Sequence, residues 1–270
     1  EKETDSKTLQ HSAEELGKCK EIDDQLDLRR QAVLDYLKKI GKPVESLSAI
    51  AARGGVIGKL NCGAYLIDES LVNASINSPA PHAANIAPVI AYELANMAGI
   101  NAYIYDPVCG CGDPEEIFTI TGMPEIEKPF LTHVLNSRAV AIQQAKADRK
   151  DLNDTTYIVA HLGGGITVNL IHKGQILDII GDDEGCFSPE RSGGLPCRPL
   201  VKLCYSGEYS EKEIQRKMKG QGGLQAYLGT NDLREVEDMI SKGNKKAEVY
   251  YQVMAMQVAK DIGALSTVTE

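Results

Sequence analysis

The most telling stretch of this chain is Ala160-His161-Leu162-Gly163-Gly164-Gly165-Ile166. An apolar run over 157–162 breaks into three consecutive glycines and resumes as a second apolar run over 166–171, which predicts two strands joined by a bend. Glycine has no Cβ atom, so the backbone N–H groups of such a bend can approach an anion closely. The stretch therefore predicts a strand–bend–strand unit that contacts a negatively charged ligand.

A second motif, Phe187-Ser188-Pro189-Glu190-Arg191-Ser192-Gly193, follows about one hairpin later. It places Arg191 on a loop flanked by serine, proline and glycine. A guanidinium group near a glycine-rich bend indicates a site for phosphate groups, because it pairs with their oxygen atoms. The plainer interpretation is a solvated loop charge, in which Arg191 pairs with Glu190 or Asp183.

The composition argues against several classes of protein. With 43% apolar and 25% charged residues, the chain is typical of a globular protein. Its net charge of −9, absence of Trp and three Phe argue against partners that are nucleic acids or anionic membrane surfaces. No run reaches the ~18–20 apolar residues of a membrane span, and no secretory signal opens the chain. The seven scattered cysteines are typical of reduced thiols, so we expect a cytoplasmic protein.

The apolar periodicity predicts two α/β halves, 1–150 and 151–270, with the boundary in the polar stretch 149–156. In the first half we expect strands at 6–11, 47–52 and 102–105, and helices at 14–40 and 128–147. We expect residues 81–98 to begin as a loop and to become a helix. In the second half we expect strands at 157–162, 166–171 and 176–180, and helices at 199–205, 211–219, 231–241 and 244–264. Gly99 is a helix stop, and Thr230 or Asn231 is the expected N-cap of helix 231–241.

Several common catalytic motifs are missing from the sequence. It contains no G-x-x-x-x-G-K-[ST], no G-x-G-x-x-G between strand and helix, no H-E-x-x-H and no G-x-S-x-G. Cys109-Gly110-Cys111 offers two thiolates, but a structural zinc site needs four ligands and no second pair lies at suitable spacing. We therefore favour ordinary thiols over a metal role for these cysteines.

A series of short motifs runs in order along nearly the whole chain. They are Arg53-Gly54-Gly55, His82-x-x-Asn85, Asp106-Pro107, His133 with Asn136, the 161–165 glycine motif, the 184–193 arginine motif, Gly222-Gly223-Leu224 and Leu228-Gly229-Thr230-Asn231-Asp232. A single triplet of this kind is weak, but the ordered series is specific. It resembles the butyrate kinases, within the acetate and propionate kinase group of the sugar kinase/Hsp70/actin superfamily.

The resemblance implies a two-lobed, actin-like α/β fold of the ribonuclease H type, with the active site in the cleft between lobes. The lobes would be 1–150, without the opening strand and its phosphate loop, and 151–270, without the adenosine-loop region. The activity implied is reversible transfer of the ATP γ-phosphoryl group to a short-chain carboxylate, giving an acyl phosphate and ADP with Mg²⁺ as cofactor. Relatives of this type generally self-associate, so a homo-oligomer is expected.

The resemblance also implies a role for each matching residue. Arg53 and Arg191 would hold the carboxylate and the transferring phosphoryl group. His133 would donate to the phosphoryl oxygens, and Asp106 would serve Mg²⁺ and active-site positioning. The nucleotide phosphates would contact His161, Gly163, Gly164 and Gly165.

Each of these assignments has a plainer alternative. Arg53 could cap a surface turn, His133 could be a packed helix residue, and an Asp106 before proline could open a turn. His82 could either approach the acyl pocket or cap the helix that starts near Asn85. These alternatives stay open at the level of the sequence.

The residue chemistry agrees with the implied reaction. A carboxylate nucleophile is already ionised at neutral pH, because its reference pKa is near ~4. No serine–histidine pair is needed to activate it, and none is evident. The difficulty is bringing one anion against another, which requires positive charge and fixed hydrogen-bond donors.

Three functions remain open. The glycine and arginine motifs favour a kinase for butyrate or a branched short-chain fatty acid, and an acetate or propionate kinase is the near alternative. The third possibility is an inactive, truncated remnant of this fold. The segments 77–81 and 108–112 depart from the expected pattern, so the length of the acyl chain is not predicted.

Overall fold

The computed structural model describes residues 3–12, 15, 19, 23–78, 80 and 83–269. The chain divides into two compact units, Glu1–Gly110 and Cys111–Glu270. This division differs from the boundary expected at 150/151, because helix α5 (Val134–Asp148) packs against strand β4 (Thr156–Leu162) and so joins the second unit. Each unit is described by itself below.

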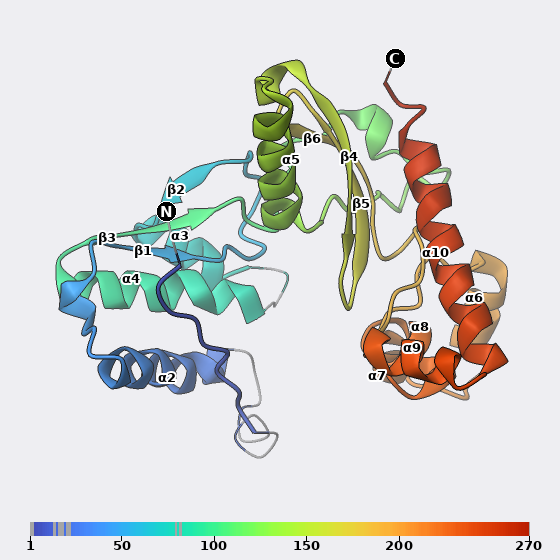
Figure 1. Cartoon of the computed structure of the whole chain (residues 1–270), viewed down its shortest axis with the longest axis horizontal. Helices are drawn as coiled ribbons and strands as arrows, with labels where there is room; N and C mark the ends of the chain where they lie inside the picture. The colour runs from blue at the N-terminus through green and yellow to red at the C-terminus, as the bar shows by residue number, and fades with distance from the viewer. Residues whose placement is uncertain are drawn as a thin grey trace. The chain divides into compact units, whose positions relative to one another are not determined.

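A three-stranded sheet forms the centre of the first unit (Figure 1). Its order is β1 (Ala49–Ala52), β3 (Asn101–Tyr105), β2 (Ala64–Leu66), with β1 parallel and β2 antiparallel to β3. Helices α2 (Leu26–Lys39), α3 (Glu69–Ile76) and α4 (Ile86–Ala98) accompany it. Ile104 on β3 is fully buried in the core, where α4 contributes Ala91 and Ala95. The sheet thereby brings the segments after β1 and β3 into the same unit.

The predictions for the first unit are confirmed in part. Strands occur where 47–52 and 102–105 predict them, and α4 ends at Gly99 in the left-handed conformation with φ +68°. The strand expected at 6–11 is wrong, because these residues form no regular structure. Helix α2 begins only at Leu26; part of the expected stretch from 14 lies outside the described residues. β2 and α3 were not predicted, because they are short.

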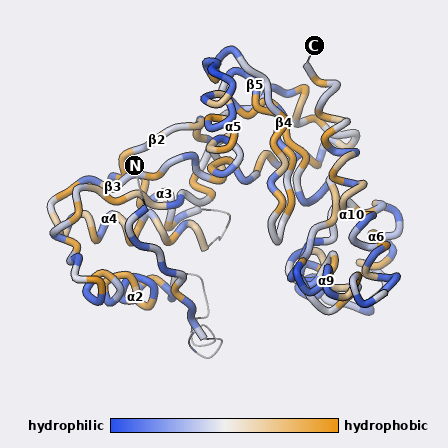
Figure 2. The backbone as a smooth tube through the Cα atoms, in the orientation of Figure 1, coloured by the Kyte–Doolittle hydropathy of each residue, from blue (hydrophilic) through white to orange (hydrophobic). Residues whose placement is uncertain are grey.

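The second unit contains an antiparallel sheet in the order β4, β5 (Ile166–His172), β6 (Gln175–Ile180). Six of the seven residues of β5 are buried, because α5 and α10 (Lys245–Leu265) both contact it (Figure 1). Figure 2 shows apolar residues along β4 and β5, as expected for a strand covered on both sides. The strands predicted at 157–162, 166–171 and 176–180 are therefore confirmed.

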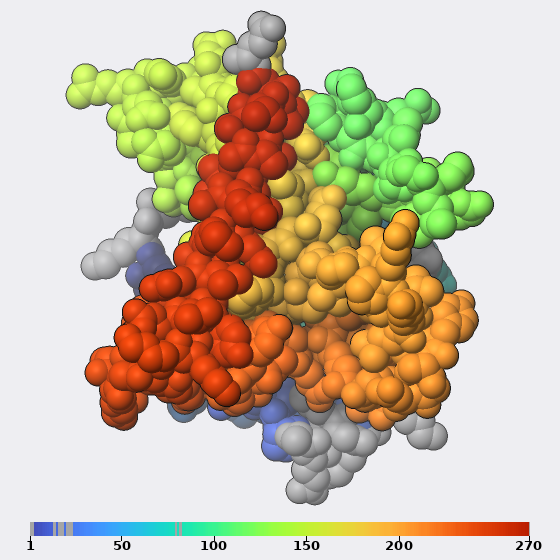
Figure 3. Space-filling view, turned by 90° about the vertical axis from the view of Figure 1, so that its right-hand side faces the viewer, coloured from blue at the N-terminus to red at the C-terminus, as the bar shows by residue number. Residues whose placement is uncertain are grey.

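Short helices complete the second unit, and the last two of them contact α10. They are α6 (Cys197–Cys204), α7 (Glu211–Met218), α8 (Gly223–Leu228) and α9 (Leu233–Ser241). A core joins Ile166 of β5, Leu224 of α8, Val236 of α9 and Met254 of α10. Figure 3 shows α10 crossing the surface of this unit lengthwise. Among the described residues, no helix is both long and apolar enough to cross a membrane.

Two helix starts in the second unit differ from the predictions. α5 begins at Val134 rather than 128, because Lys128 is held outside the helix by contacts to Asp178 and Glu184. The N-cap of α9 is Asp232, whose side chain accepts from the Arg234 N–H, rather than Thr230 or Asn231. α8 was not predicted. The four predicted helices beyond residue 196 are present within one to two residues at each end.

A matched pair of substitutions tests the core of the second unit. Val236 is fully buried, whereas Val249 is 53% exposed. We expect Val236→Ala to lower the free energy of unfolding by roughly 1.5–3 kcal/mol, through lost burial and a residual cavity. Val249→Ala should change it by less than ~0.5 kcal/mol. Urea denaturation measures both values; equal losses would contradict the packing of α9 under α10.

Candidate active site

In the bend between β4 and β5, glycine is needed because neighbouring groups leave no room for a side chain, and not because of the backbone conformation. None of Gly163, Gly164 and Gly165 has a positive φ. A Cβ atom on Gly165 would lie within 2.7 Å of Nη1 and Nε of Arg191, so no side chain fits there. The Gly163 N–H is used inside the bend, where it donates to the Gly165 carbonyl over 3.2 Å. The bend therefore provides a seat for a guanidinium group.

Direct hydrogen bonds attach the arginine loop to the glycine bend. The Gly164 carbonyl accepts from the Ser188 hydroxyl at 2.6 Å and from the Glu190 N–H at 3.2 Å. The loop closes on itself, because the Ser188 N–H donates to the Arg191 carbonyl at 3.0 Å and the Arg191 N–H donates to Ser188 Oγ at 3.1 Å. The two motifs singled out in the sequence thus form one structural unit.

The first turn of helix α8 binds the backbone of this loop. The N–H groups of Leu224 and Gln225 donate to the Ser188 and Pro189 carbonyls, at 3.2 and 2.8 Å. Gly223 has φ +59°, and any side chain there would overlap the Ser188 carbonyl. The Gly222-Gly223 pair is therefore required for the close approach of two backbones.

Arg191 is only 18% exposed at its side chain and forms an ion pair with Asp182. The simple interpretation that it pairs with Glu190 or Asp183 is wrong in its partner: the Glu190 carboxylate instead accepts from the Asn231 amide at 3.1 Å. The buried Nε–H of Arg191 makes no hydrogen bond within the described part of the chain. A buried donor left unpaired costs about 1–3 kcal/mol, so the packing of Arg191 against Gly165 is held at a cost in stability.

Two histidines stack beside the bend. The rings of His133 and His161 lie 3.8 Å apart between centroids and within 9° of parallel. Asn136 Nδ2 lies 2.9 Å from His161 Nδ1, and Thr167 Oγ1 lies 3.1 Å from His133 Nδ1. His133 is the N-cap residue of α5 rather than a residue within the helix. The pattern of the sequence paired His133 with Asn136 but gave no sign of the stacking.

Three of the sequence-predicted residues belong to the first unit. Arg53 follows β1 and is exposed. Asp106 follows β3 with φ +42° and is 2% exposed; its Oδ1 accepts from the Gly63 N–H at 2.8 Å. His82 lies outside the described residues.

Close packing joins the motifs around Arg53 and Asp106 within the first unit. A Cβ atom on Gly54 would lie 3.2 Å from Pro107 Cα, and one on Gly55 would lie 2.7 Å from the Asn85 nitrogen. Asn85 Oδ1 accepts from the Val56 N–H at 2.8 Å. Three segments that are far apart in the sequence, at 53–55, 84–85 and 106–107, are therefore neighbours here.

The described residues contain no group of three or more His, Cys, Asp or Glu that could hold a metal ion. Asp106 is the carboxylate that the family resemblance assigns to Mg²⁺. Mg²⁺ commonly binds one or two carboxylates and relies on substrate phosphates and water for its other ligands. Asp106 therefore fits an ion that arrives with a nucleotide.

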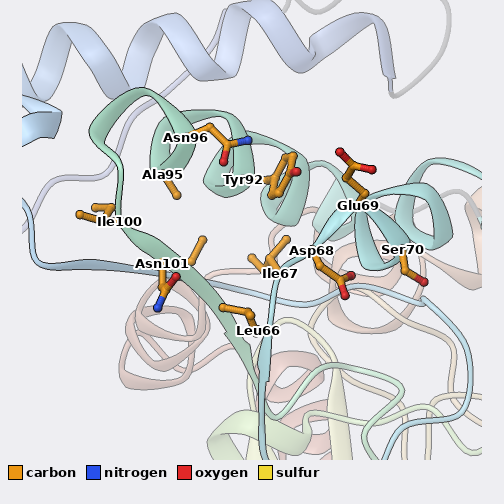
Figure 4. Close-up of a pocket in the computed structure, with 11 residues that line it drawn as sticks. Leu66, Ile67, Asp68, Glu69, Ser70, Tyr92, Ala95, Asn96, Ile100 and Asn101 are labelled. Carbon is orange, nitrogen blue, oxygen red and sulfur yellow. The ribbon is translucent and has the colours of Figure 1, made fainter.

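A pocket with a volume of about 620 Å³ lies elsewhere in the first unit (Figure 4). Tyr92 and Ile100 contribute apolar walls, while Asp68 and Glu69 contribute carboxylates. None of the sequence-predicted site residues lines it. Two carboxylates repel an anion, so this pocket does not suit a phosphate or a carboxylate substrate.

The backbone just before the arginine loop is tied to α10. The N–H groups of Cys186 and Phe187 donate to Asp261 Oδ2 at 2.8 Å and to Gln257 Oε1 at 3.1 Å. Burial, with Asp261 as a second cause, raises the pKa of the Cys186 thiol to about 12. The thiol thus stays protonated at neutral pH and has a structural role.

A comparison with known proteins gives the family of this chain. A family described as the acetokinase family matches residues 132–270. Butyrate kinase 2 of Clostridium acetobutylicum is 39% identical over 273 residues, which cover all of this chain and 76% of that protein. The chain belongs to the acetokinase family. Butyrate kinase 1 of the same organism is 40% identical over 271 residues, again 76% of its length.

Solved structures of this family share the fold. The acetate kinase of Porphyromonas gingivalis superposes with a TM-score of 0.78 at 21% identity, over 89% of this chain and 64% of that one. A propionate kinase from Francisella tularensis gives 0.75 at 21% identity, over 89% and 65%. The chain thus spans just under two thirds of these structures. The predicted α/β class and actin-like ATPase fold are confirmed.

The resemblance seen in the sequence is likewise confirmed. The comparisons support the enzyme class that it implies, a carboxylate kinase that makes an acyl phosphate from ATP. They do not test the roles of individual residues, and these remain predictions.

A first prediction from this geometry concerns the glycine bend. Gly165→Ala should displace the Arg191 guanidinium and lower the rate of phosphoryl transfer by at least ~10²-fold, as for a lost charge-stabilising donor. Gly122→Ala is the matched control, because a Cβ atom there would have no neighbouring atom within 4 Å. It should cost less than ~10-fold. Equal losses in a steady-state assay would contradict the seating of Arg191 on Gly165.

A second prediction concerns thiol reactivity. With a pKa of about 12, the Cys186 thiol should be ionised to roughly one part in ten thousand at pH 8, and it is buried as well. Cys197 and Cys204 are exposed and should react with an alkylating reagent at that pH. Mass spectrometry of digested protein reads each site separately. Modification of Cys186 as fast as Cys204 in the folded chain would refute the assignment.

Proposed function

We propose that this chain transfers the γ-phosphoryl group of ATP to butyrate or to a branched short-chain fatty acid, and catalyses the reverse reaction. The observation that carries the proposal is the Arg191 guanidinium, seated on Gly165 with a buried, unpaired Nε–H, at the end of the strand that carries His161. An arginine so placed suits a transferring phosphoryl group. Identity of 39–40% to two butyrate kinases supports the choice of acyl group.

In the proposed reaction, a carboxylate oxygen attacks the γ-phosphorus atom. A new P–O bond forms to the acyl oxygen, and the bond from the γ-phosphorus to the β–γ bridging oxygen breaks, so that its electron pair leaves with ADP. No proton transfer is needed, because the nucleophile is ionised at neutral pH. Catalysis then depends on holding two anions in line and on neutralising charge.

We assign roles to the residues of the second unit from their chemistry. Arg191 would pair with oxygens of the transferring group, which requires that Asp182 release one face of its guanidinium. His133 and His161 would donate hydrogen bonds to phosphoryl oxygens. Gly163, Gly164 and Gly165 would allow the nucleotide phosphates to approach the backbone.

The assignments in the first unit rest on the family resemblance. Arg53 would bind the carboxylate, His82 would line the acyl pocket, and Asp106 would act on Mg²⁺. When bound with ATP, Mg²⁺ would neutralise charge on the phosphates. Self-association and a cytoplasmic location also remain proposals.

The test is an assay with ATP, Mg²⁺ and straight or branched carboxylates of two to five carbons, in which hydroxylamine traps the acyl phosphate. We expect butyrate or isobutyrate to give the highest kcat/KM. A preference for acetate would replace the proposal with an acetate kinase. Absence of turnover in a chain with a normal melting transition would identify an inactive remnant.

Arg191→Ala should lower kcat by roughly 10³–10⁵-fold, by analogy with arginines that stabilise charge in other phosphoryl transfers. The control is Arg198→Ala, which removes an exposed arginine of α6 and should leave the rate nearly unchanged. Circular dichroism confirms that both variants fold. A loss below ~10-fold for Arg191→Ala would remove this residue from the reaction.

A further inference from the structure

Strand β5 buries two polar side chains in an otherwise apolar run. Thr167 is 2% exposed and Asn169 is fully buried, and both lie on the face that α5 covers. Burial of an amide or hydroxyl is costly unless each polar atom finds a partner. Apolar residues would stabilise the sheet equally well, so the polar pair calls for an explanation beyond packing.

The hydrogen bonds of Asn169 fix the direction of its amide. The Thr132 hydroxyl donates to Asn169 Oδ1, which identifies the oxygen end of the side chain. The Nδ2 end donates to Ser137 Oγ at 2.7 Å and, over 3.4 Å, to Thr167 Oγ1. Because an amide nitrogen only donates, the Thr167 oxygen is the acceptor in this last contact.

The direction of the network continues to His133. Accepting from Asn169 uses one lone pair of Thr167 Oγ1, and its own proton can then be donated to His133 Nδ1, 3.1 Å away. A neutral imidazole that accepts at Nδ1 carries its proton on Nε2. With this direction of donation, the buried amide favours the Nε2–H tautomer of a histidine that it does not touch.

The second histidine is held in the same way. Asn136 Nδ2 donates to His161 Nδ1 over 2.9 Å, so this ring also carries its proton on Nε2. That nitrogen lies at the bend, 2.8 Å from the place where a Gly163 Cβ would be. Two stacked imidazolium cations 3.8 Å apart would repel each other, so the arrangement suits two neutral rings.

We propose that Asn169 is a positioning residue, which acts through Thr167 to hold His133 as its Nε2–H tautomer. With His161 held likewise by Asn136, the stacked pair offers two fixed Nε2–H donors without adding positive charge. Such donors stabilise charge that develops on phosphoryl oxygens and need no reorganisation during the reaction. This inference rests on the proposed function only where it names the phosphoryl group; the tautomer itself is independent of it.

The direct test is two-bond ¹⁵N–¹H correlation spectroscopy of the full chain labelled with ¹⁵N-histidine. The chain has five histidines, and His133→Gln identifies the signals of His133. We expect the Nε2–H form for His133 in the unaltered protein. Asn169→Asp replaces the donor by an acceptor, so Thr167 should donate to residue 169 and the His133 proton should move to Nδ1. A His133 proton on Nδ1 in the unaltered chain overturns the proposal.

A second set of variants keeps the test decisive if Asn169→Asp does not fold. Thr167→Val removes the hydroxyl and should lower kcat by roughly tenfold or more, with KM nearly unchanged. This loss should be smaller than the ~10²–10³-fold loss of kcat that follows when a donor to the reacting group is itself removed. Thr167→Ser retains the hydroxyl and should restore most of the rate. Thr155→Val is the matched control, since it removes another buried hydroxyl, which donates to the Leu152 carbonyl. Thr155 lies just before β4, at the opposite end of that strand from the bend.

The outcomes separate this inference from the proposed function. If Thr167→Val and Thr155→Val lower kcat equally, the role of Thr167 is structural and the proposal fails. Suppose that the chain phosphorylates no carboxylate, but His133 carries its proton on Nε2 and Asn169→Asp moves that proton to Nδ1. The positioning role then holds and the proposed function fails. Normal turnover with the His133 proton on Nδ1 refutes the positioning role alone.

Discussion

The absence of a side chain at residue 165 is the constraint on which the candidate site depends. The Arg191 guanidinium fills the space that a Cβ atom there would need. This contact holds a positive charge at the end of two adjacent strands, and two hydrogen bonds to the Gly164 carbonyl keep the loop in register with the bend. The Ser188 and Pro189 carbonyls in turn bind the first turn of α8. Bend, loop and helix therefore form one rigid unit.

Much of this arrangement could be predicted from the sequence, where the signal is local. The runs 157–162 and 166–171 have the composition of strands, and three glycines can only interrupt them. The start of α5 could not be predicted, because an ion pair between Lys128 and Asp178, 50 residues apart in the sequence, holds the preceding segment outside the helix. No local pattern encodes such a contact.

The candidate site shows the same distinction. The importance of Arg191 follows from its motif, but its partner Asp182 follows from the path of the chain after β6, so the sequence pointed to neighbouring acids instead. Thr167 and Asn169 were missed because β-branched and polar residues occur in many strands without functional meaning. Their signal was present nonetheless: two polar residues at a spacing of two, on one face of an apolar run.

The anchoring of α10 to the backbone before the arginine loop has a consequence for the integrity of the chain. Asp261 and Gln257 lie near the carboxyl end of that helix, yet they accept the N–H groups of Cys186 and Phe187, five and four residues before Arg191. The helix therefore holds the backbone of this loop in place, and the residues that bind it lie in its last turns. Loss of the chain from residue 257 onward would remove both acceptors, and it would also uncover Val168 and Leu170 of β5, which pack with Leu265.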